Sequence, residues 1–366
     1  MKQFNYIISG GGTGGHIYPA LAIANQIKAE DPTASIVFVG ALGKMEMEKV
    51  PQAGYKIHGI WIAGIQRAKL WKNFFFPLKL MISLIHSFFI WLRYRPDVLI
   101  GTGGFASGPM LYVGGAMGSK TYLQEQNSYP GITNKLLAKR AAGIAVAYPG
   151  MERYFPKEKI HYTGNPVRES LLKISSLREQ GLAHFNLDPT KKTLAVLGGS
   201  LGARAINDLI ADHIELFDQL NLQLIWQCGK MYYEDYASFS SRSINVHSFI
   251  QEMDCLYAAA DFIISRAGAS TISELSIVAK PSILIPSPNV AENHQYKNAA
   301  VLAEKGAAIL MPESSAKETF EATLKTIVLS EKKQLAMAES LAQMALPKAT
   351  ETIVQHIKKL IPSHAK

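Results

Sequence analysis

Short apolar runs alternate with longer stretches of helical periodicity along the whole chain. In the first half, the apolar runs predict strands at residues 6–9, 35–39, 56–62, 98–101 and 121–124, with helical patterns between most of them. After residue 190 the pattern restarts with the runs TLAVLGGS, LQLIWQCG, SINVHSF, DFIISRAG, PSILIPSP and AAILMPE, again separated by helical segments. Strands that alternate with helices predict parallel sheets covered on both faces. The restart predicts two α/β domains of similar size.

The break between these domains is expected at TGNPVRES, residues 163–170, because Gly, Asn and Pro together interrupt regular structure. It separates a first domain of residues 1–165 from a second domain of residues 166–346. The last helical patterns, about residues 317–345 and 348–360, contain no strand. The segment from about residue 347 to residue 366 could therefore pack back on the first domain.

Composition narrows the class of protein only partly. The chain has 366 residues, a length typical of about two domains, and a formal net charge of +9. A basic surplus attracts anions, which include nucleic acid, phosphorylated substrates and anionic membrane surfaces. Cys228 and Cys255 form no CxxC pair, so neither a zinc site nor a disulfide framework is expected. The first apolar run is too short for a signal peptide, and a cytoplasmic protein is expected.

Glycine-rich turns recur directly after predicted strands. They read SGGGTGGH at 9–16, GTGGFASG at 101–108, GGSLGAR at 198–204 and SRAGAST at 265–271. One such loop is weak evidence of a binding site. Several are stronger evidence, because ligands of open α/β sheets bind at the carboxyl ends of the strands.

The first loop matches the glycine pattern of a dinucleotide-binding motif but lacks the acidic residue that this motif requires. Gly10, Gly12 and Gly15 satisfy G-x-G-x-x-G, which also requires an acidic residue about 20 positions later, at the end of the second strand. Asp31 precedes that strand and Glu46 lies beyond it. A nicotinamide dinucleotide site is therefore disfavoured.

The same loop still fits the general physics of anion binding. A Walker A loop is excluded, because His16 stands where that motif needs Lys followed by Ser or Thr. Glycines let the backbone approach a ligand closely, and the N–H groups at a helix start favour an anion. Pro19 suits the first turn of the helix that follows. A tight turn without a ligand is the alternative.

Several motifs occur in an order that is specific to one family. They are GGTGGHIYPALAIA, GTGGFASGP, EQNSYPGITN, GNPVR, GGSLGAR and RAGASTISEL followed by ENHQYKNA. With these motifs the sequence resembles, over nearly its whole length, the bacterial family 28 glycosyltransferases that move N-acetylglucosamine from UDP-GlcNAc onto lipid I, giving lipid II for peptidoglycan. The resemblance implies the α/β GT-B fold, in which two Rossmann-like domains with parallel sheets face each other across a cleft. It also implies inversion at the sugar carbon, with no nucleotide-bound metal ion and no cofactor.

The resemblance also implies partners and a location. The first domain would take the acceptor and the membrane, and the second domain would take UDP-GlcNAc. The partners would be UDP-GlcNAc, lipid I, an anionic membrane surface and other proteins of cell-wall synthesis, but no nucleic acid. The protein would be peripheral, on the cytoplasmic face of the bacterial cell membrane.

Site residues carry over from the family motif by motif. In the second domain, which holds most of the UDP in the family, the matching positions are Arg168, Ser200, Ile250, Glu274 and Gln295. In the first domain they are Thr13, Gly14 and Gly15 of the first loop and Asn127 of EQN. Ile250 would contact the uracil through backbone groups.

Each polar position in the second domain also has a purely structural interpretation. Ser200 could meet a diphosphate at a helix start or could act as a helix N-cap. Arg168 could pair with a phosphate oxygen or lie solvated at the surface. Glu274 could accept both ribose hydroxyls, or it could complete a capping box with Thr271. Gln295 could bind a sugar hydroxyl or occupy a polar helix face.

The reaction that the resemblance implies needs a base and a stabilised leaving group. We expect His16 to take the proton of the acceptor hydroxyl, because histidine titrates near neutral pH. Its alternative role is to position phosphate, and Glu125 is the alternative base. Gln124 stands where some family members carry His, and Phe105 replaces a frequent Tyr. A mechanism that depends on a histidine at position 124 or on a tyrosine hydroxyl at position 105 is therefore not expected here.

Residues 68–97 form the most apolar part of the chain. Pro77, Lys79 and His86 interrupt the stretch, so a membrane span is disfavoured. Apolar residues recur at helical spacing, namely Phe74, Leu78, Met81, Leu84 and Phe88, with Arg67, Lys69, Lys72, Lys79, Arg93 and Arg95 around them. An apolar face with basic flanks suits a helix that lies on an anionic bilayer. A core helix of the first domain is the alternative.

Two other functions remain open at this point. One is a different lipid-directed GT-B enzyme, such as a diacylglycerol glycosyltransferase, which would differ in its acceptor. The other is a non-enzymatic scaffold that binds sugar nucleotide or membrane. The joint presence of Arg168, Ser200, Glu274 and Gln295 argues against the scaffold.

Overall fold

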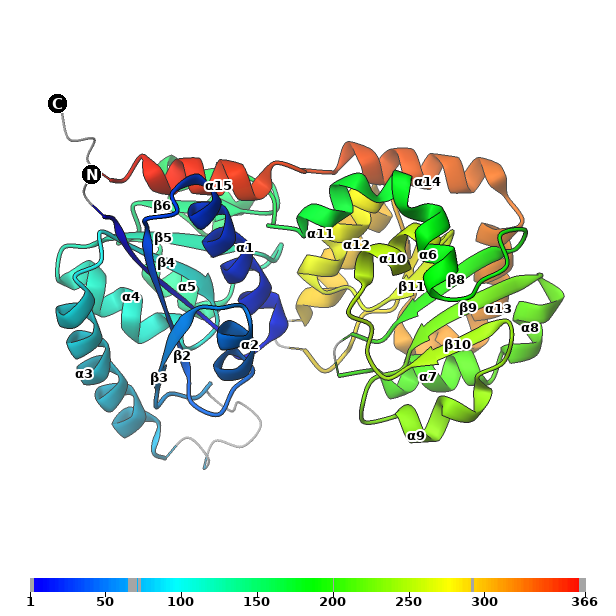
Figure 1. The fold of residues 1–366 in the computed structure, drawn as a ribbon, viewed down its shortest axis with the longest axis horizontal. Coiled ribbons are helices and arrows are strands. Elements are labelled where there is room, and N and C mark those ends of the chain that lie inside the picture. The colour runs from blue at the N-terminus through cyan, green and yellow to red at the C-terminus, as the bar shows by residue number, and fades with distance from the viewer. Residues whose placement is uncertain (1–2, 65–70, 72–73, 200, 291–292, 362–366) are drawn as a thin grey trace. The chain divides into compact units, whose positions relative to one another are not determined.

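The computed structural model describes residues 3–64, 71, 74–199, 201–290 and 293–361. The chain divides into two compact units (Figure 1). Unit 1 comprises Met1–Val167 and Lys348–Lys366, and unit 2 comprises Arg168–Pro347. Along the chain, unit 2 is therefore an insertion into unit 1.

Unit 1 contains a seven-stranded sheet in the order β3-β2-β1-β4-β5-β6-β7, and every neighbouring pair is parallel. The strands are β1 (Asn5–Gly10), β2 (Ser35–Ala41), β3 (Lys56–Ile60), β4 (Val98–Gly103), β5 (Lys120–Glu125), β6 (Gly143–Val146) and β7 (Ile160–Tyr162). The helices are α1 (Gly14–Glu30), α2 (Glu46–Gln52), α3 (Phe76–Tyr94), α4 (Ser107–Ala116), α5 (Ile132–Leu137) and α15 (Ala349–Lys358).

Helices cover both faces of this sheet. Along β1, Tyr6 and Ile8 enter one core, which includes residues of α1 and α15. Ile7, between them, enters the other core, which includes residues of α3, α4 and α5. Because side chains alternate along a strand, a strand buried on both faces must be apolar throughout. This is why the strands read as continuous apolar runs in the sequence.

Unit 2 contains a six-stranded parallel sheet in the order β10-β9-β8-β11-β12-β13. The strands are β8 (Lys192–Leu197), β9 (Leu222–Gln227), β10 (Ile244–His247), β11 (Phe262–Ser265), β12 (Ser282–Leu284) and β13 (Ile309–Leu310). The helices are α6 (Arg178–His184), α7 (Arg204–Ala211), α8 (Ile214–Gln219), α9 (Tyr233–Tyr236), α10 (Met253–Ala259), α11 (Ala269–Val278), α12 (His294–Glu304), α13 (Ala316–Val328) and α14 (Glu331–Gln343).

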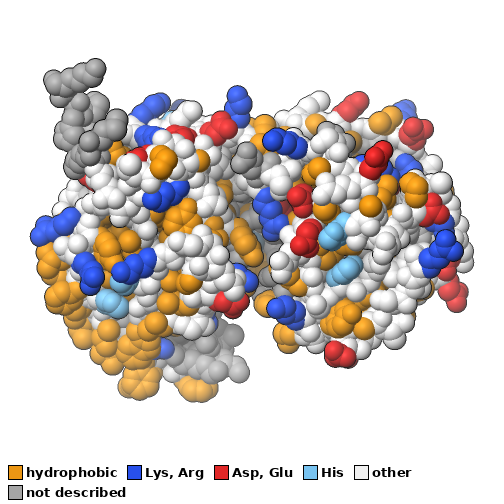
Figure 2. Space-filling view, viewed as in Figure 1, with side chains coloured by type: hydrophobic (Ala, Val, Ile, Leu, Met, Phe, Trp, Pro, Cys, Tyr) orange, Lys and Arg blue, Asp and Glu red, His pale blue; other side chains and the backbone are white. Residues whose placement is uncertain are grey.

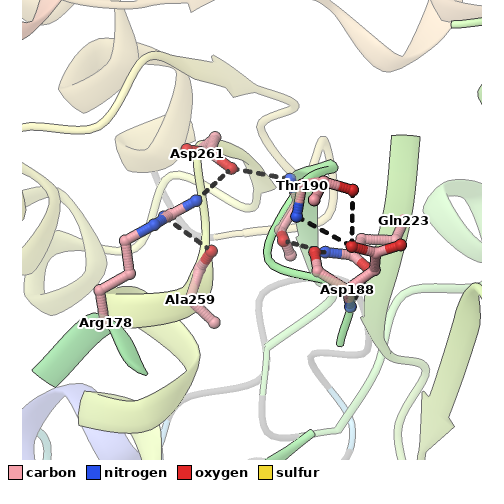
Figure 3. A network of polar contacts seen from close by, with 7 residues as sticks. Arg178, Asp188, Thr190, Gln223, Ala259 and Asp261 are labelled. Atoms are coloured by element: carbon pink, nitrogen blue, oxygen red, sulfur yellow. Dashed lines mark hydrogen bonds and ion pairs between the residues drawn. The ribbon is translucent and has the colours of Figure 1, made fainter. Parts of the chain in front are cut away.

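A polar network fixes the amino ends of the strands in unit 2 (Figure 3). The Asp261 carboxylate accepts a hydrogen bond from the backbone N–H of Thr193 at 2.8 Å and pairs with the Arg178 guanidinium at 3.2 Å. Gln223 accepts from the backbone N–H of Asp188 at 2.9 Å and donates to the Asp188 carbonyl oxygen at 2.8 Å. This network lies at the opposite end of the sheet from the glycine-rich loops, so it supports the fold and not the binding edge.

The predicted fold class is confirmed, and three local predictions need correction. The short strands β6 and β7 were not expected. The helical pattern at about 317–345 is two helices, because Ser330 acts as the N-cap of α14 and accepts a hydrogen bond from the Lys333 N–H. Pro19 is not in the first turn, since α1 already begins at Gly14. Proline has no N–H group, so the Gly15 carbonyl lacks its usual helical partner.

Helix α15 packs on α1 in unit 1 (Figure 1). Its buried residues Ile353, Val354 and Ile357 belong to the same core as β1 and α1. On the same helix, the His356 ring stacks on His161 of β7 with centroids 3.9 Å apart. Burial lowers the pKa of both histidines, and each is lowered further by the charge of Lys359. The folded protein therefore favours the uncharged stack.

We expect the melting temperature to fall as the pH is lowered from about 7 to about 5. The unfolded histidines have a pKa of about 6.5, so on acidification the unfolded chain binds protons before the folded chain does. Stability from this pair is thus present above about pH 6.5 and is lost as the pH falls toward the lower folded pKa. His356→Phe keeps an aromatic ring and removes one titration, so its Tm should depend less on pH. Equal slopes of Tm against pH in the wild type and in His356→Phe would contradict a contribution of this histidine pair.

Candidate active site

The four glycine-rich loops all follow strands at the switch points of the two sheets. In unit 1 the strand order reverses between β1 and β4, and in unit 2 it reverses between β8 and β11. The loops that begin at residues 11, 104, 198 and 266 follow those four strands. In open α/β sheets, ligands bind outside the carboxyl ends of the strands at such switch points. The glycine-rich loops predicted from the sequence therefore lie at the switch point of each sheet.

The two loops of unit 1 lie in direct contact. Gly104 has a φ of +79°, and a Cβ placed on it would lie 2.2 Å from the carbonyl oxygen of Gly11. Only glycine therefore permits this conformation and this approach. The Phe105 ring covers Gly12, where a Cβ would lie 3.0 Å from the ring. Phe105 thus contributes packing between the two loops.

His16 lies in the first turn of α1 and contacts the ends of β4 and β5. Its Nδ1 atom is 2.9 Å from the carbonyl oxygen of Thr102 and 3.1 Å from Oε1 of Gln126. The Thr102 hydroxyl donates in return to the His16 carbonyl oxygen at 2.8 Å. Among the described residues, Nε2 of His16 has no hydrogen-bond partner. The ring is therefore held through one nitrogen while the other stays available.

The start of α1 leaves room for a ligand beside the backbone. Thr13 is the N-cap, and its carbonyl oxygen accepts from the His16 N–H at 3.1 Å, while its side chain makes no capping bond. A Cβ on Gly15 would meet only the Thr13 hydroxyl, at 3.7 Å, whereas on Gly14 it would lie 3.1 Å from the Tyr18 ring. Exposed backbone N–H groups at such a helix start suit an anion.

Glu46 braces the first glycine loop, a role that the sequence did not reveal. Its side chain is fully buried at the start of α2. One carboxylate oxygen accepts from the backbone N–H of Gly12 and the other from that of Ala41, both at 2.9 Å. The acidic residue that seemed misplaced for binding a ribose therefore shapes the loop itself.

Glu125 is the centre of a second buried cluster. One carboxylate oxygen accepts from the backbone N–H of Asn127 at 3.0 Å and from its side chain at 3.3 Å. The other accepts from the Asn134 side chain at 2.8 Å and from the Gly131 N–H at 3.1 Å. Only 2% of Glu125 is exposed. Its oxygens organise the loop after β5, which makes it a poorer base candidate than His16.

In unit 2, Arg168 and Glu274 lie together. The Arg168 Nε atom is 3.6 Å from one Glu274 oxygen, and the Tyr257 hydroxyl donates to the other at 2.9 Å. Burial raises the pKa of the Glu274 carboxyl, while the Arg168 charge and the Tyr257 hydrogen bond oppose that rise. The capping box is ruled out, because α11 begins at Ala269 with Gly268 as its N-cap. Glu274 therefore belongs to a charged cluster and not to a helix cap.

Gln227, which the sequence analysis missed, joins two predicted binding segments of unit 2. Its Nε2 donates to the Gly199 carbonyl oxygen at 3.2 Å, and its Oε1 accepts from the Ile250 N–H at 2.9 Å. The backbone N–H of Ile250 is thus already engaged within the protein. Ser200 lies outside the described residues, and the N-cap of α7 is Ala203.

Gln295 lies in the first turn of α12 and points back to the loop after β12. Its Oε1 accepts from the Ser287 backbone N–H at 2.8 Å. The amide NH₂ group is the part that can still donate to a ligand oxygen. Gln295 therefore combines a structural bond with the capacity to bind.

Comparison with known families decides the identity. The model of the glycosyltransferase family 28 N-terminal domain matches residues 6–146, and that of the family 28 C-terminal domain matches residues 193–353.

The chain belongs to glycosyltransferase family 28.

Curated family 28 relatives align along the full chain. A protein of Flavobacterium psychrophilum is 54% identical over 364 residues and one of Christiangramia forsetii is 52% identical over 362 residues, with 99% of both chains covered in each case. Both are named UDP-N-acetylglucosamine--N-acetylmuramyl-(pentapeptide) pyrophosphoryl-undecaprenol N-acetylglucosamine transferase.

Solved structures agree on the fold. The crystal structure of Acinetobacter baumannii MurG superposes with a TM-score of 0.77 at 25% identity, covering 98% of this chain and all of that one. The kitacinnamycin glycosyltransferase, at 14% identity, superposes with a TM-score of 0.73 and supports the same fold.

Within each unit, the structure brings several predicted residues of this family 28 chain together. His16 meets the EQN segment through Gln126, and Arg168 meets Glu274. The residues that sequence reasoning missed act as braces between these segments. Glu46, Tyr257 and Gln227 each bond to a partner 17 or more positions away, and no local pattern marks such contacts. In the part of the chain that the structure describes, no group of three metal-ligating side chains gathers.

Proposed function

We propose that this chain transfers N-acetylglucosamine from UDP-GlcNAc to undecaprenyl-pyrophosphoryl-MurNAc-pentapeptide (lipid I), giving lipid II. The observation that carries the proposal is the full-length similarity, at about half of all positions, to curated enzymes named for this transfer. The local geometry agrees, because both units offer polar clusters at the binding edges of their sheets.

Unit 2 is proposed to bind the donor. Glu274 would accept the ribose hydroxyls, and Arg168, which lies 3.6 Å from it, would pair with a diphosphate oxygen. The loop that contains Ser200 would receive the diphosphate, the Ile250 backbone the uracil, and the Gln295 amide a sugar hydroxyl. In unit 1, Thr13, Gly14, Gly15 and Asn127 are proposed to contribute further donor contacts.

The proposed reaction is a single displacement at C1 of the sugar. The bond from C1 to the diphosphate oxygen breaks, and its electron pair leaves with UDP. A new bond forms from C1 to the acceptor hydroxyl, whose proton passes to Nε2 of His16. Helix N-termini and Arg168 would stabilise the charge on the leaving diphosphate. Glu125 is the second candidate base, ranked lower because its oxygens already accept four hydrogen bonds.

The acceptor is tested directly with radiolabelled UDP-GlcNAc. The protein is incubated with lipid I and, separately, with diacylglycerol, and labelled lipid is extracted in each case. Label on lipid I is the expected result. Label on diacylglycerol alone would assign the chain to a different lipid-directed transferase, and label on neither would support a non-enzymatic role.

The α3 surface is proposed to dock on an anionic bilayer at the cytoplasmic face of the membrane. Helix α3 is long and apolar enough to span a membrane by composition, with a mean hydropathy of 1.3. Its buried face contains Ser83, Ser87, Ile90 and Trp91, so much of its apolar side points outward. Figure 2 shows hydrophobic side chains gathered over α3 with Lys and Arg beside them. Arg67, Lys69 and Lys72 lie outside the described residues.

Replacing Met81, Ile85 and Phe89 with serine is expected to weaken binding to anionic vesicles about a hundredfold. These side chains are 53%, 52% and 60% exposed on one face of α3. Partial insertion of each is worth about 1 kcal/mol, and every 1.4 kcal/mol changes an affinity about tenfold. Vesicle flotation at low salt measures the effect.

The matched control replaces three exposed apolar residues of unit 2, Met231, Leu329 and Leu335, with serine. That variant should float with vesicles as the wild type does. A wild-type protein that stays with the soluble fraction at low salt would refute docking by α3.

A further inference from the structure

Three buried amide side chains connect His16 to the end of the sheet in unit 1. They are Gln126 and Gln124, at the end of β5, and Asn165, after β7, with 1%, 0% and 3% of their surface exposed. We propose that this amide chain is a positioning device that holds His16 with its proton on Nδ1 and its lone pair on Nε2. The proposal rests on the proposed function, in which Nε2 of His16 is the base.

The Thr102 carbonyl oxygen sets the protonation of the ring. A carbonyl oxygen can only accept a hydrogen bond, and it lies 2.9 Å from Nδ1 of His16. Nδ1 must therefore carry the proton in this arrangement. In a neutral imidazole the other nitrogen then has the lone pair, so Nε2 is the basic atom.

Gln126 reinforces this assignment only in one orientation of its amide. Its Oε1 lies 3.1 Å from Nδ1 of His16, and its Nε2 donates to the Thr102 carbonyl oxygen at 2.7 Å. The reversed amide would place an oxygen against the Thr102 oxygen and an N–H against the Nδ1–H group. Both contacts would then be repulsive. The correct orientation of Gln126 and the Nδ1–H form of His16 thus require each other.

Gln124 and Asn165 hold Gln126 in that orientation. The Gln126 NH₂ group donates to Oε1 of Gln124, and the Gln124 NH₂ group donates to Oδ1 of Asn165 at 2.8 Å. The Asn165 NH₂ group donates at 3.0 Å to the backbone carbonyl oxygen of Gln126, which can only accept. Each amide is therefore oriented by the next, and the last is oriented by the backbone. Burial strengthens the effect, because a reversed amide would leave unsatisfied groups away from water.

This arrangement gives Gln126 and Gln124 a function beyond folding. An imidazole without a fixed partner at Nδ1 could place its proton on either nitrogen, and only one form has a lone pair on Nε2. When the ring is already in that form as the acceptor binds, no change of tautomer is needed before the proton is transferred. Gln126 and Gln124 are positioning residues, since they act through His16 and do not touch the acceptor in this scheme.

The first test reads the tautomer directly. ¹⁵N NMR of the imidazole nitrogens in the ligand-free full chain, at a pH where His16 is neutral, should give one tautomer with the proton on Nδ1. A proton on Nε2 would overturn the proposal. This reading needs no activity, so the tautomer assignment can stand even if the chain glycosylates a different acceptor or none.

The second test uses two variants and a matched control. Gln126→Met removes the direct partner of His16, while Gln124→Met leaves that partner in place and releases its orientation. Both should show a larger fraction of the Nε2–H form than the wild type, because the Thr102 carbonyl is then the only oriented acceptor for Nδ1–H. Both should also lower kcat about tenfold or more, with KM for UDP-GlcNAc within about twofold of the wild type. Gln223→Met removes a buried amide from the network in Figure 3 and should lower Tm without changing the tautomer or kcat.

The outcomes separate a positioning role from a merely structural one. A pure Nδ1–H tautomer and unchanged kcat in Gln126→Met would overturn the proposal. A pure Nδ1–H tautomer and unchanged kcat in Gln124→Met alone would show that Gln124 and Asn165 do not position His16, and would limit the device to Gln126. If one variant does not fold, the wild-type tautomer still tests the proton on Nδ1, and the other variant tests the contribution of the amide chain.

Discussion

Replacing His16 with alanine is expected to lower kcat by about a hundredfold or more, within the roughly 10²–10⁴-fold range of a positioned general base. The affinity for UDP should stay nearly unchanged, because the proposed donor contacts of unit 2 do not involve this side chain. Steady-state kinetics with lipid I and equilibrium binding of UDP measure the two quantities separately.

The matched control is His213→Ala in unit 2. The Nδ1 atom of His213 also lies close to a backbone carbonyl oxygen, that of Leu209, at 2.8 Å, but the residue follows the carboxyl end of α7, whereas the glycine-rich loop precedes that helix. Its kcat should equal that of the wild type. An unchanged kcat in His16→Ala would remove His16 as the base and leave Glu125 as the remaining candidate.

Replacing Glu274 with glutamine is expected to raise KM for UDP-GlcNAc by about 10- to 100-fold with little change in kcat. A hydrogen bond to a charged acceptor contributes about 1.5–3 kcal/mol, and 1.4 kcal/mol corresponds to a factor of about ten. The glutamine keeps the shape of the side chain and one acceptor oxygen, but it removes the charge that pairs with Arg168. Initial rates at varied donor concentration measure the effect.

The pH dependence of KM for UDP-GlcNAc gives an independent check on the role of Glu274. Burial raises the pKa of Glu274, so on acidification this carboxylate becomes neutral at a higher pH than an ordinary glutamate does. KM for the donor should rise with it in the wild type but not in Glu274→Gln. Glu321→Gln, which removes a surface partner of Lys325 on α13, should leave KM unchanged. An unaltered KM in Glu274→Gln would exclude the carboxylate from donor binding.

Much of the fold could be predicted from the sequence because both sheets are buried on both faces. Strands such as β1 and β8 therefore contain continuous apolar runs and end at or directly before a glycine, a strong local signal. The strand β7 was missed because it is a partly exposed edge strand, IHY, without a continuous apolar run. The strand β6 was missed although its four residues, GIAV, match the length of the predicted strand β11. The boundary between α13 and α14 was missed because the capping residue, Ser330, interrupts the helical pattern for very few positions.

The candidate site could be predicted less completely than the fold. Glycine loops and His16 stand out because each follows a strand within a few residues. Glu46, by contrast, bonds to Gly12 from 34 positions away, and Gln126 bonds to His16 from 110 positions away. Such pairs depend on which strands are neighbours in the sheet. Their hydrogen bonds decide which side chains remain available for ligands, as with Glu125, and that distinction needs the tertiary structure.

The place of α15 in unit 1 has a consequence for synthesis in the cell. Unit 2 is one continuous segment, so its core can assemble as soon as it has left the ribosome. The core beneath α1 must wait for Ile353, Val354 and Ile357, which are translated after all of unit 2. Domains generally fold in order of synthesis, and here the first to emerge is the last to be finished. A transcript broken after the codon for Pro347 would leave unit 2 whole and expose an apolar face on unit 1, which marks the product for chaperones and proteases.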